Sequence, residues 1–133
     1  MIGILVATHG TLAEELLRTA ETVVGRIEQS RAVAVDPRVQ DMRAAIKDAI
    51  KSVDTGDGVL LLTDLPGGSP TNFCLSFLEE RKVEVVTGVN LPMLLKAGQL
   101  RTKGKPIVQV ATEVAEAGQR SIRHASGLLR GMG

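Results

Sequence analysis

Short, almost uninterrupted apolar runs, each followed by a helix-like segment, constrain the fold of this chain most. The runs are IGILVAT (2–8), RAVAV (31–35), VLLLTD (59–64) and VEVVTGV (83–89). A near-continuous apolar run is typical of a strand that is covered on both faces. Strands that alternate with helices form right-handed crossovers in an open parallel sheet. We therefore predict a doubly wound α/β fold with helices on both faces of the sheet and the strand order 2-1-3-4.

Polar residues and prolines indicate where the helices begin. Thr11, with Glu14 three residues later, has the spacing of a capping box, and Gly25 is placed to end that helix. The other predicted starts are Asp36 followed by Pro37, Ser69 followed by Pro70, and Asn90 with Pro92 close behind.

The segment after residue 100 is ambiguous. IVQVAT (107–112) has the composition of a strand, but its apolar residues also fit a helical stripe that begins after Pro106. We favour a helix over about 106–118 and then a short strand in SIRHAS (121–126).

Composition narrows the possible functions. The chain has 133 residues and 44% hydrophobic residues, which indicates a single domain over 1–133 with a packed core. The net charge of +1, without any basic run, argues against nucleic acid as a partner. Cys74 is the only cysteine and is expected to be buried and reduced. No apolar run is long enough for a membrane span, so we expect a cytoplasmic protein.

Two residues with complementary chemistry follow the first and third predicted strands. His9 comes directly after the first strand and Asp64 ends the third. In the order 2-1-3-4 these strands are neighbours, about 4.8 Å apart, and their carboxyl ends meet in one crevice. A carboxylate that accepts the Nδ1 proton leaves a lone pair on Nε2, which is a nucleophile. We therefore predict that His9 and Asp64 form a catalytic pair.

Glycines and hydroxyl groups surround this predicted pair. Two helix N-termini converge there, and glycine allows the backbone to approach an anion closely. The predicted phosphate-binding residues are Thr8, Gly10, Thr11, Gly67, Gly68 and Ser69. A nucleophilic imidazole beside such groups indicates phosphoryl transfer to histidine. Because no Walker lysine motif and no magnesium-ligand cluster is visible, we expect no cofactor and no metal, and a phosphoprotein as donor.

Each of these signals alone has an ordinary structural explanation. A histidine after a strand is more often a packing or surface residue, and GGSP is commonly a turn into a capped helix. The combination at neighbouring strand ends is what favours a site. His124, the second histidine, lies among polar residues and is expected at the surface.

Three segments resemble the mannose-family enzyme IIA of the bacterial phosphoenolpyruvate-dependent sugar phosphotransferase system. They are GILVATHGTLAEELLRTAETVVG, LLLTDLPGGSPTN and TGVNLPMLLKA, and the resemblance runs to about residue 125. It implies phosphorylation of His9 at Nε2, orientation by Asp64 and a phosphate contact from Ser69. It also implies HPr as donor, a IIB component as acceptor, contact with the membrane only through a transporter complex, and a homodimer that exchanges its last antiparallel strand.

The resemblance has two departures and leaves alternatives open. Pro66 and Thr71 stand where family members often carry aromatic residues, and we expect both positions at the rim of the site. The 133 residues contain no fused IIB segment, so we expect the acceptor to be a separate protein or to be missing altogether. The alternatives are a regulatory module that reports its phosphorylation state, the phosphotransferase subunit of dihydroxyacetone kinase, and a flavodoxin-like ligand binder. Scarce aromatic residues argue against a flavin.

Overall fold

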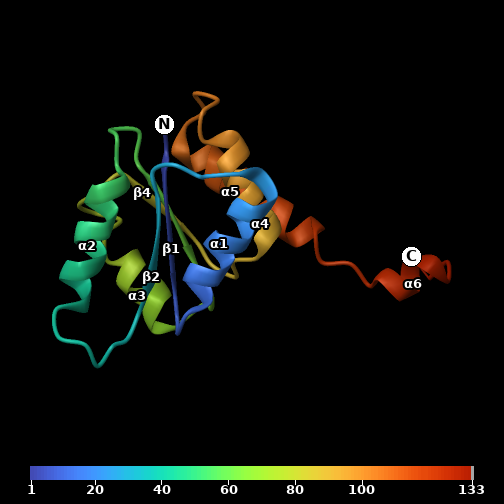
Figure 1. Ribbon diagram of the computed structural model, residues 1–133, viewed down its shortest axis with the longest axis horizontal. Coiled ribbons are helices and arrows are strands. Elements are labelled where there is room, and N and C mark those ends of the chain that lie inside the picture. Colours follow the sequence, from blue (N-terminus) through green and yellow to red (C-terminus); the bar gives the residue numbers. More distant parts are fainter. Residues whose placement is uncertain (133) are drawn as a thin grey trace.

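A four-stranded, all-parallel sheet forms the centre of the protein (Figure 1). The computed structural model describes residues 1–132. The strands are β1 (Gly3–Thr8), β2 (Ser30–Ala34), β3 (Val59–Thr63) and β4 (Val83–Val86), and the helices are α1 (Leu12–Val24), α2 (Met42–Val53), α3 (Ser69–Leu75), α4 (Leu91–Leu100), α5 (Ile107–Arg120) and α6 (Ala125–Leu129). The order β2-β1-β3-β4 confirms the predicted order 2-1-3-4.

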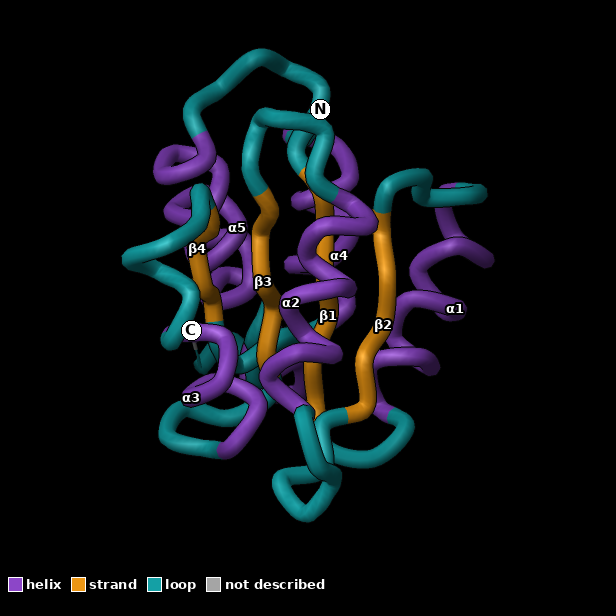
Figure 2. Tube along the Cα trace, turned by 90° about the vertical axis from the view of Figure 1, so that its left-hand side faces the viewer, coloured by secondary structure: helices purple, strands orange, loops and turns teal. Residues whose placement is uncertain are grey.

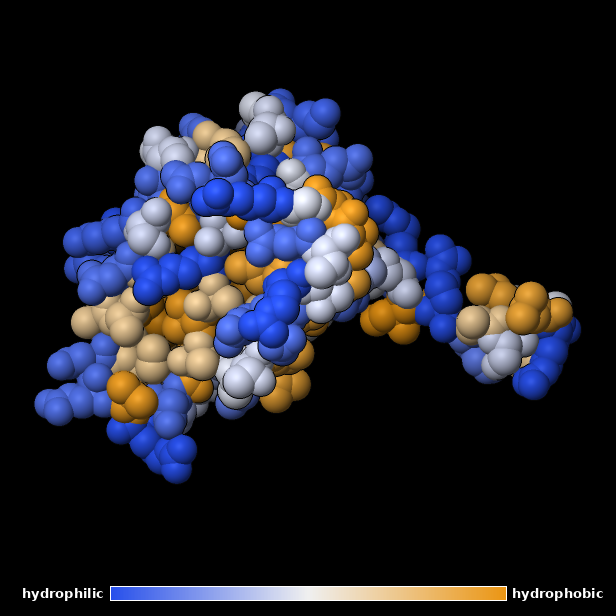
Figure 3. Space-filling view, viewed as in Figure 1, coloured by the Kyte–Doolittle hydropathy of each residue, from blue (hydrophilic) through white to orange (hydrophobic). Residues whose placement is uncertain are grey.

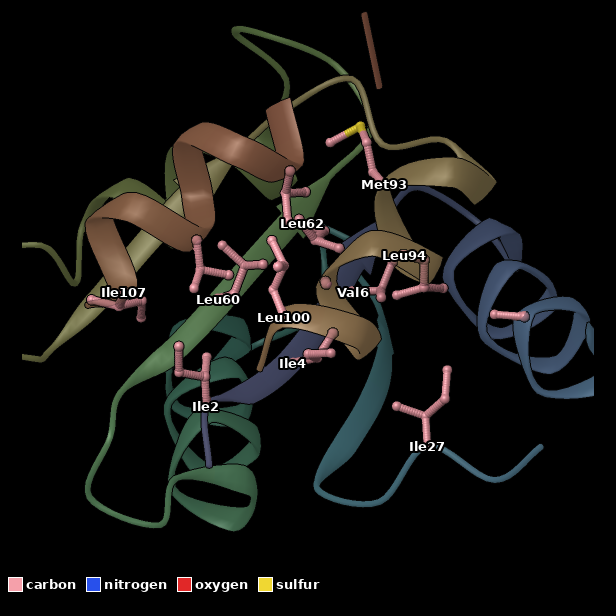
Figure 4. Packing of buried hydrophobic residues seen from close by; sticks show 14 of the residues in the cluster. Ile2, Ile4, Val6, Ile27, Leu60, Leu62, Met93, Leu94, Leu100 and Ile107 are labelled. Carbon is pink, nitrogen blue, oxygen red and sulfur yellow. The ribbon is translucent and has the colours of Figure 1, made fainter. Parts of the chain in front are cut away.

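Helices cover both faces of the sheet, as the apolar runs predict. In Figure 2, α2 and α3 lie in front of the strands, while α4 and α5 lie behind them. Successive side chains of β1 alternate between the two cores: Ile4 and Val6 pack under α1, α4 and α5, and Leu5 and Ala7 pack under α2 and α3. Figure 4 shows side chains of β1, β3, α4 and α5 pointing toward one another in the first of these cores.

The central and edge strands differ in burial. Every residue of β1 and β3 is buried, whereas β2 and β4 are partly exposed. The difference follows from position, because β1 and β3 each have a hydrogen-bonded neighbour on both sides and a helix layer on both faces.

Of the predicted helix starts, that at Thr11 is confirmed in position but not in its capping bond, and those at Asp36 and Ser69 are wrong. Thr11 makes no side-chain cap; the hydroxyl of Thr8 accepts from the Ala13 N–H at 2.8 Å instead. Asp36 bonds the backbone and side chain of Arg38 in a turn, and α2 begins only at Met42. Gly68 precedes α3, so Ser69 is the first helical residue rather than its cap. The other two boundary predictions are confirmed: Asn90 accepts from Met93 N–H at 3.0 Å, and Gly25 ends α1.

The last part of the chain confirms one prediction and overturns another. The ambiguous segment is helical, as α5. The strand predicted at 121–126 is wrong: residues 122–124 have no regular structure, and α6 begins at Ala125. A short apolar run becomes a strand only when a ladder partner is beside it, and this tail projects away from the sheet (Figure 1).

Three further observations complete the description of residues 1–132. None of their helices combines the length and apolar character that a membrane crossing needs. Cys74 is buried as a free thiol, and burial raises its pKa to about 12, so it is a core residue. His124 is exposed, as predicted.

Candidate functional site

The strand register brings His9 and Asp64 to the same end of the sheet. Ala7 of β1 lies opposite Thr63 of β3, so the residues that follow leave the sheet side by side. Because β1 and β3 are parallel neighbours, both lead to the carboxyl edge of the sheet, where open α/β folds bind their ligands.

Asp64 holds His9 through two hydrogen bonds. Its Oδ2 atom accepts from the backbone N–H of His9 at 2.9 Å and lies 2.8 Å from the ring Nδ1. A carboxylate only accepts, so Nδ1 carries the proton in this contact. The other oxygen, Oδ1, accepts from the Leu65 N–H at 2.9 Å. Both carboxylate oxygens are therefore engaged, and the ring orientation is set.

The surroundings of Asp64 favour its charged form. Its side chain is only 11% exposed, and that burial pushes the pKa of the carboxyl group upward. The hydrogen bonds from the backbone and the ring of His9 act in the opposite direction and prevail, so the pKa lies below the ordinary value of 3.8. Asp64 is thus a carboxylate at neutral pH and can stabilise positive charge on the imidazole.

The reactive face of His9 is open. Its side chain is 48% exposed, while Nδ1 faces Asp64. With the proton on Nδ1, Nε2 carries a lone pair, which makes it an available nucleophile.

Gly68 lies directly against the imidazole. A Cβ atom at this position would stand 3.1 Å from Cε1 of His9, closer than an ordinary carbon contact. Glycine is therefore needed here for the loop before α3 to approach the ring. Gly67 serves the turn itself, since its φ of +76° is unfavourable for residues with a side chain.

The remaining predicted phosphate-binding residues differ in exposure, and Thr8 alone among them is fully buried. Gly10, exposed with φ +54°, directly follows His9, and Ser69, half-buried, adjoins Gly68, which lies against the ring. Thr11 and Gly10 line a hollow of about 280 Å³ between α1 and β2 that also includes Glu14. Thr8 is fully buried; its hydroxyl donates to the His9 carbonyl at 3.0 Å and caps α1. Thr8 thus positions the backbone of His9 and has no exposed surface to offer a ligand.

Three threonines support the loop that carries Asp64, and two of them, Thr63 and Thr87, were not among the residues that the sequence analysis singled out. Thr71 donates to the Leu65 carbonyl, and its hydroxyl oxygen lies 2.7 Å from that of Thr63 and 3.3 Å from that of Thr87. Thr71 is 5% exposed, so its expected place at the rim is wrong; it lies beneath the loop. The available signal was a threonine that ends β3, in LLLTD, and another that directly follows β4, in VVTG.

No group of three His, Cys, Asp or Glu side chains in residues 1–132 is arranged to hold a metal ion. The chemistry of the site is that of an oriented imidazole beside a carboxylate.

Known proteins resemble this chain in sequence. The family model "PTS system fructose IIA component" (EIIA-man) matches residues 3–115. The mannose-specific EIIAB component of Escherichia coli K12 is 30% identical over 92% of this chain, which spans only 39% of that protein. The fructose-specific EIIA component of Bacillus subtilis is 30% identical over 76% of this chain and 71% of its own length.

A solved structure extends the agreement to three dimensions. The phosphotransferase system component EIIA of Streptococcus agalactiae is 27% identical, with a TM-score of 0.84 over 95% of this chain and 98% of that protein. On the family match and the identity with these relatives, the chain belongs to the EIIA-man family of phosphotransferase system IIA components.

Proposed function

We propose that His9 accepts a phosphoryl group on Nε2 and passes it to a second protein. The observation that carries the proposal is the 2.8 Å contact between Nδ1 and Asp64, with the ring half-exposed. This contact presents Nε2 as the nucleophile and supplies a counter-charge for the product. By family, the donor would be phosphorylated HPr and the acceptor a IIB component.

The proposed step balances without a cofactor. Nε2 of His9 attacks phosphorus as the bond to the donor breaks, and the donor leaves with the electron pair of that bond. The ring then carries phosphate on Nε2 and a proton on Nδ1, and Asp64 offsets its positive charge. We propose that backbone groups at Gly68, which lies against the ring, and at the adjoining Ser69 orient the phosphate oxygens.

Exposure to phosphorylated HPr, followed by intact-mass measurement and site mapping, tests the proposal. We expect one added phosphoryl group, acid-labile and base-stable, on His9. His9→Ala should abolish labelling, while His124→Ala, which removes the other, exposed histidine, should label as the parent does. Labelling of His9→Ala at the parental level would refute the proposal.

A second experiment separates relay from regulation. Phosphorylated chain mixed with a purified IIB component should lose its phosphoryl group to that protein. If the phosphoryl group stays on His9 and another protein binds only one of the two states, the chain acts as a regulatory module instead.

We further propose that residues 1–133 act as one cytoplasmic IIA domain that forms a homodimer. The tail after α5 supports the dimer: Ile122 is 78% and Leu129 90% exposed, and Figure 3 shows apolar side chains gathered on this projecting tail. Analytical ultracentrifugation should give twice the monomer mass, and Leu128→Ser with Leu129→Ser should shift it toward the monomer.

A further inference from the structure

Three threonine hydroxyl groups meet beneath the loop that carries Asp64. They come from three elements, since Thr63 ends β3, Thr71 lies in α3 and Thr87 directly follows β4. α3 contacts both strands and lies in front of their carboxyl ends in Figure 2. Thr63 is fully buried and Thr71 is 5% exposed. The cluster therefore lies in the interior, at the same end of the sheet as His9.

The direction of the hydrogen bonds in this cluster is fixed. A hydroxyl group has one proton, and a carbonyl can only accept, so Thr71 donates its proton to the Leu65 carbonyl. The Thr71 oxygen can then only accept from the hydroxyl groups of Thr63, at 2.7 Å, and Thr87, at 3.3 Å. Successive hydrogen bonds of this kind strengthen one another in a buried setting. The cluster as a whole therefore donates to the Leu65 carbonyl.

Leu65 is the residue on which this cluster acts. Its carbonyl also accepts from the Gly68 N–H at 3.3 Å, which closes a four-residue turn. Its own N–H donates to Oδ1 of Asp64 at 2.9 Å. Leu65 therefore joins the carboxylate that orients the imidazole to the glycine that packs against the ring. A displacement of Leu65 would disturb both contacts of the ring.

The turn from Leu65 to Gly68 has little freedom of its own. Pro66 at its second position fixes φ at about −65°, and a glycine with positive φ at the third position is the pattern of a type II turn. Gly67 meets that requirement with a φ of +76°. Pro66 and Thr71 are also the two positions at which the sequence departs from the resemblance given above. Both departures thus act on one loop, because Pro66 shapes the turn and Thr71 holds its first carbonyl.

We propose that Thr71 is a positioning residue for phosphoryl transfer at His9, and that it acts through the Leu65 carbonyl on Asp64 and Gly68. The inference rests on the proposed function and adds a residue whose hydrogen bonds go to neither the imidazole nor its carboxylate. The hydroxyl group holds the loop in its reactive geometry before the donor binds. Its loss should therefore slow the transfer step and leave donor binding unchanged.

Thr71→Val and Thr71→Ser separate the hydroxyl group from the shape of the side chain. Valine keeps both branches at Cβ but has no hydroxyl group, whereas serine keeps the hydroxyl group and loses a methyl group. In single-turnover labelling by phosphorylated HPr, we expect Thr71→Val to lower the maximal rate about fivefold, because a displacement of about 1 Å costs about 100-fold and this one is smaller. The half-saturating donor concentration should stay within about twofold of the parental value, and Thr71→Ser should restore the rate to within about twofold.

A second measurement needs no phosphoryl donor. Nitrogen NMR of the His9 imidazole, at a pH at which the ring is neutral, reports which ring nitrogen carries the proton. The parent should carry it on Nδ1, which faces Asp64. We expect a larger share of the other tautomer in Thr71→Val and the parental share in Thr71→Ser. This measurement decides on Thr71 even if the parent is not phosphorylated, an outcome that would refute only the proposed function.

Ile50→Val controls for a general loss of stability. Ile50 is fully buried in α2, close to Val53, whose carbonyl lies against Gly3 at the start of β1. The variant removes one buried carbon at the end of the sheet away from His9 and should lower the melting temperature about as much as Thr71→Val does. We expect it to keep the parental rate and tautomer. Equal slowing by both variants, or a parental rate and tautomer in Thr71→Val, would overturn the proposal.

If Thr71→Val fails to fold, Thr63→Val takes its place. This variant removes the nearer of the two donors to Thr71 and leaves the bond from Thr71 to the Leu65 carbonyl. We expect a smaller change in the same direction, about twofold in the transfer rate, with a matching shift of the tautomer. Parental values of both would overturn the proposal.

Discussion

The buried charges at the two ends of the sheet differ in the number of hydrogen bonds they make. At the carboxyl end, Asp64 accepts two hydrogen bonds from His9 and one from Leu65, which engage both carboxylate oxygens. At the amino end, Arg101, which follows α4, is more deeply buried than Asp64 but donates one long hydrogen bond. A satisfied buried charge holds its neighbours in one geometry, whereas an unsatisfied one lowers the stability of the fold.

The comparison indicates which end of the sheet suits the phosphoryl transfer that we propose. Phosphoryl transfer needs a nucleophile in one tautomer and one orientation, and the complete set of bonds around Asp64 supplies both. The amino end has charge and volume but no nucleophile held by a second group in this way.

The largest expected effect comes from Asp64→Asn. In asparagine an NH₂ group replaces one carboxylate oxygen, and it would face an N–H group from which that oxygen now accepts a hydrogen bond. The tautomer of the His9 ring would then no longer be enforced. We expect phosphoryl transfer to fall roughly 100-fold or more, and stability to fall by about 1–3 kcal/mol. Single-turnover labelling and urea unfolding measure the two effects.

Asp54→Asn is the matched control at the other end of the sheet. Asp54 accepts a single hydrogen bond from Gly56 N–H through Oδ1, which an amide oxygen can also accept. Transfer should stay near the parental rate. A comparable loss in both variants would show that Asp64 has no special role.

Gly68→Ala is expected to have the next largest effect. The new Cβ would stand 3.1 Å from the ring of His9, so the imidazole must move by a few tenths of an ångström. We expect transfer to slow roughly tenfold, because a displacement of 1 Å costs about 100-fold. The φ of −76° at Gly68 suits alanine, so stability should change little.

Gly67→Ala should do the opposite, lowering stability while leaving the transfer rate nearly unchanged. Its φ of +76° makes alanine unfavourable by about 1–2 kcal/mol, but no atom lies within 4 Å of the added carbon. Measuring both variants distinguishes the two effects. Thermal unfolding reports the backbone strain of Gly67→Ala, and the transfer rate reports the contact of Gly68→Ala with the His9 ring. If Gly68→Ala were instead the less stable and the more active, the packing argument would fail.

Thr71→Val tests the support beneath the loop. It removes the hydroxyl that bonds the Leu65 carbonyl and contacts Thr63 and Thr87, at a cost of about 1–2 kcal/mol in unfolding free energy. Thr112→Val is the control, because its hydroxyl bonds only the Val108 carbonyl on an exposed helix face. We expect the control to stay within about 0.5 kcal/mol of the parent in urea unfolding.

The smallest effect is a pH dependence of stability. The pKa of Asp64 is lower in the folded state than its ordinary value of 3.8. The ionised carboxylate therefore contributes fully to folding stability at pH values well above 3.8, and this contribution is lost as the pH falls through the folded pKa. The gap in unfolding free energy between the parent and Asp64→Asn should therefore narrow below about pH 4. A gap that widens on acidification would contradict the direction of the shift.

The strands and the contact between His9 and Asp64 could be predicted because their signals are local and strong. Uninterrupted apolar runs mark β1 and β3, and His9 and Asp64 follow them directly. In a parallel sheet, residues just beyond neighbouring strands must leave at the same edge, so adjacency in space follows from strand order.

Caps and the tail could not be predicted in the same way. Thr11 and Asp36 have the right residue type, but Thr8 reaches the first turn of α1, and Arg38 engages Asp36. Competition among nearby donors and acceptors decides a cap, and that competition depends on the packed backbone. The 121–126 segment has strand-like residues but no neighbouring strand in the chain to pair with.

By itself, the sequence determined the parallel α/β sheet, its strand order and the meeting of an imidazole with a carboxylate, because apolar periodicity and chain order govern all three. Only the tertiary structure decided that Gly68 touches the ring, that Thr71 lies beneath the loop, and that Arg101 is buried with too few partners. Those features arise from distances between segments far apart in the chain, and no local pattern of residues encodes such distances.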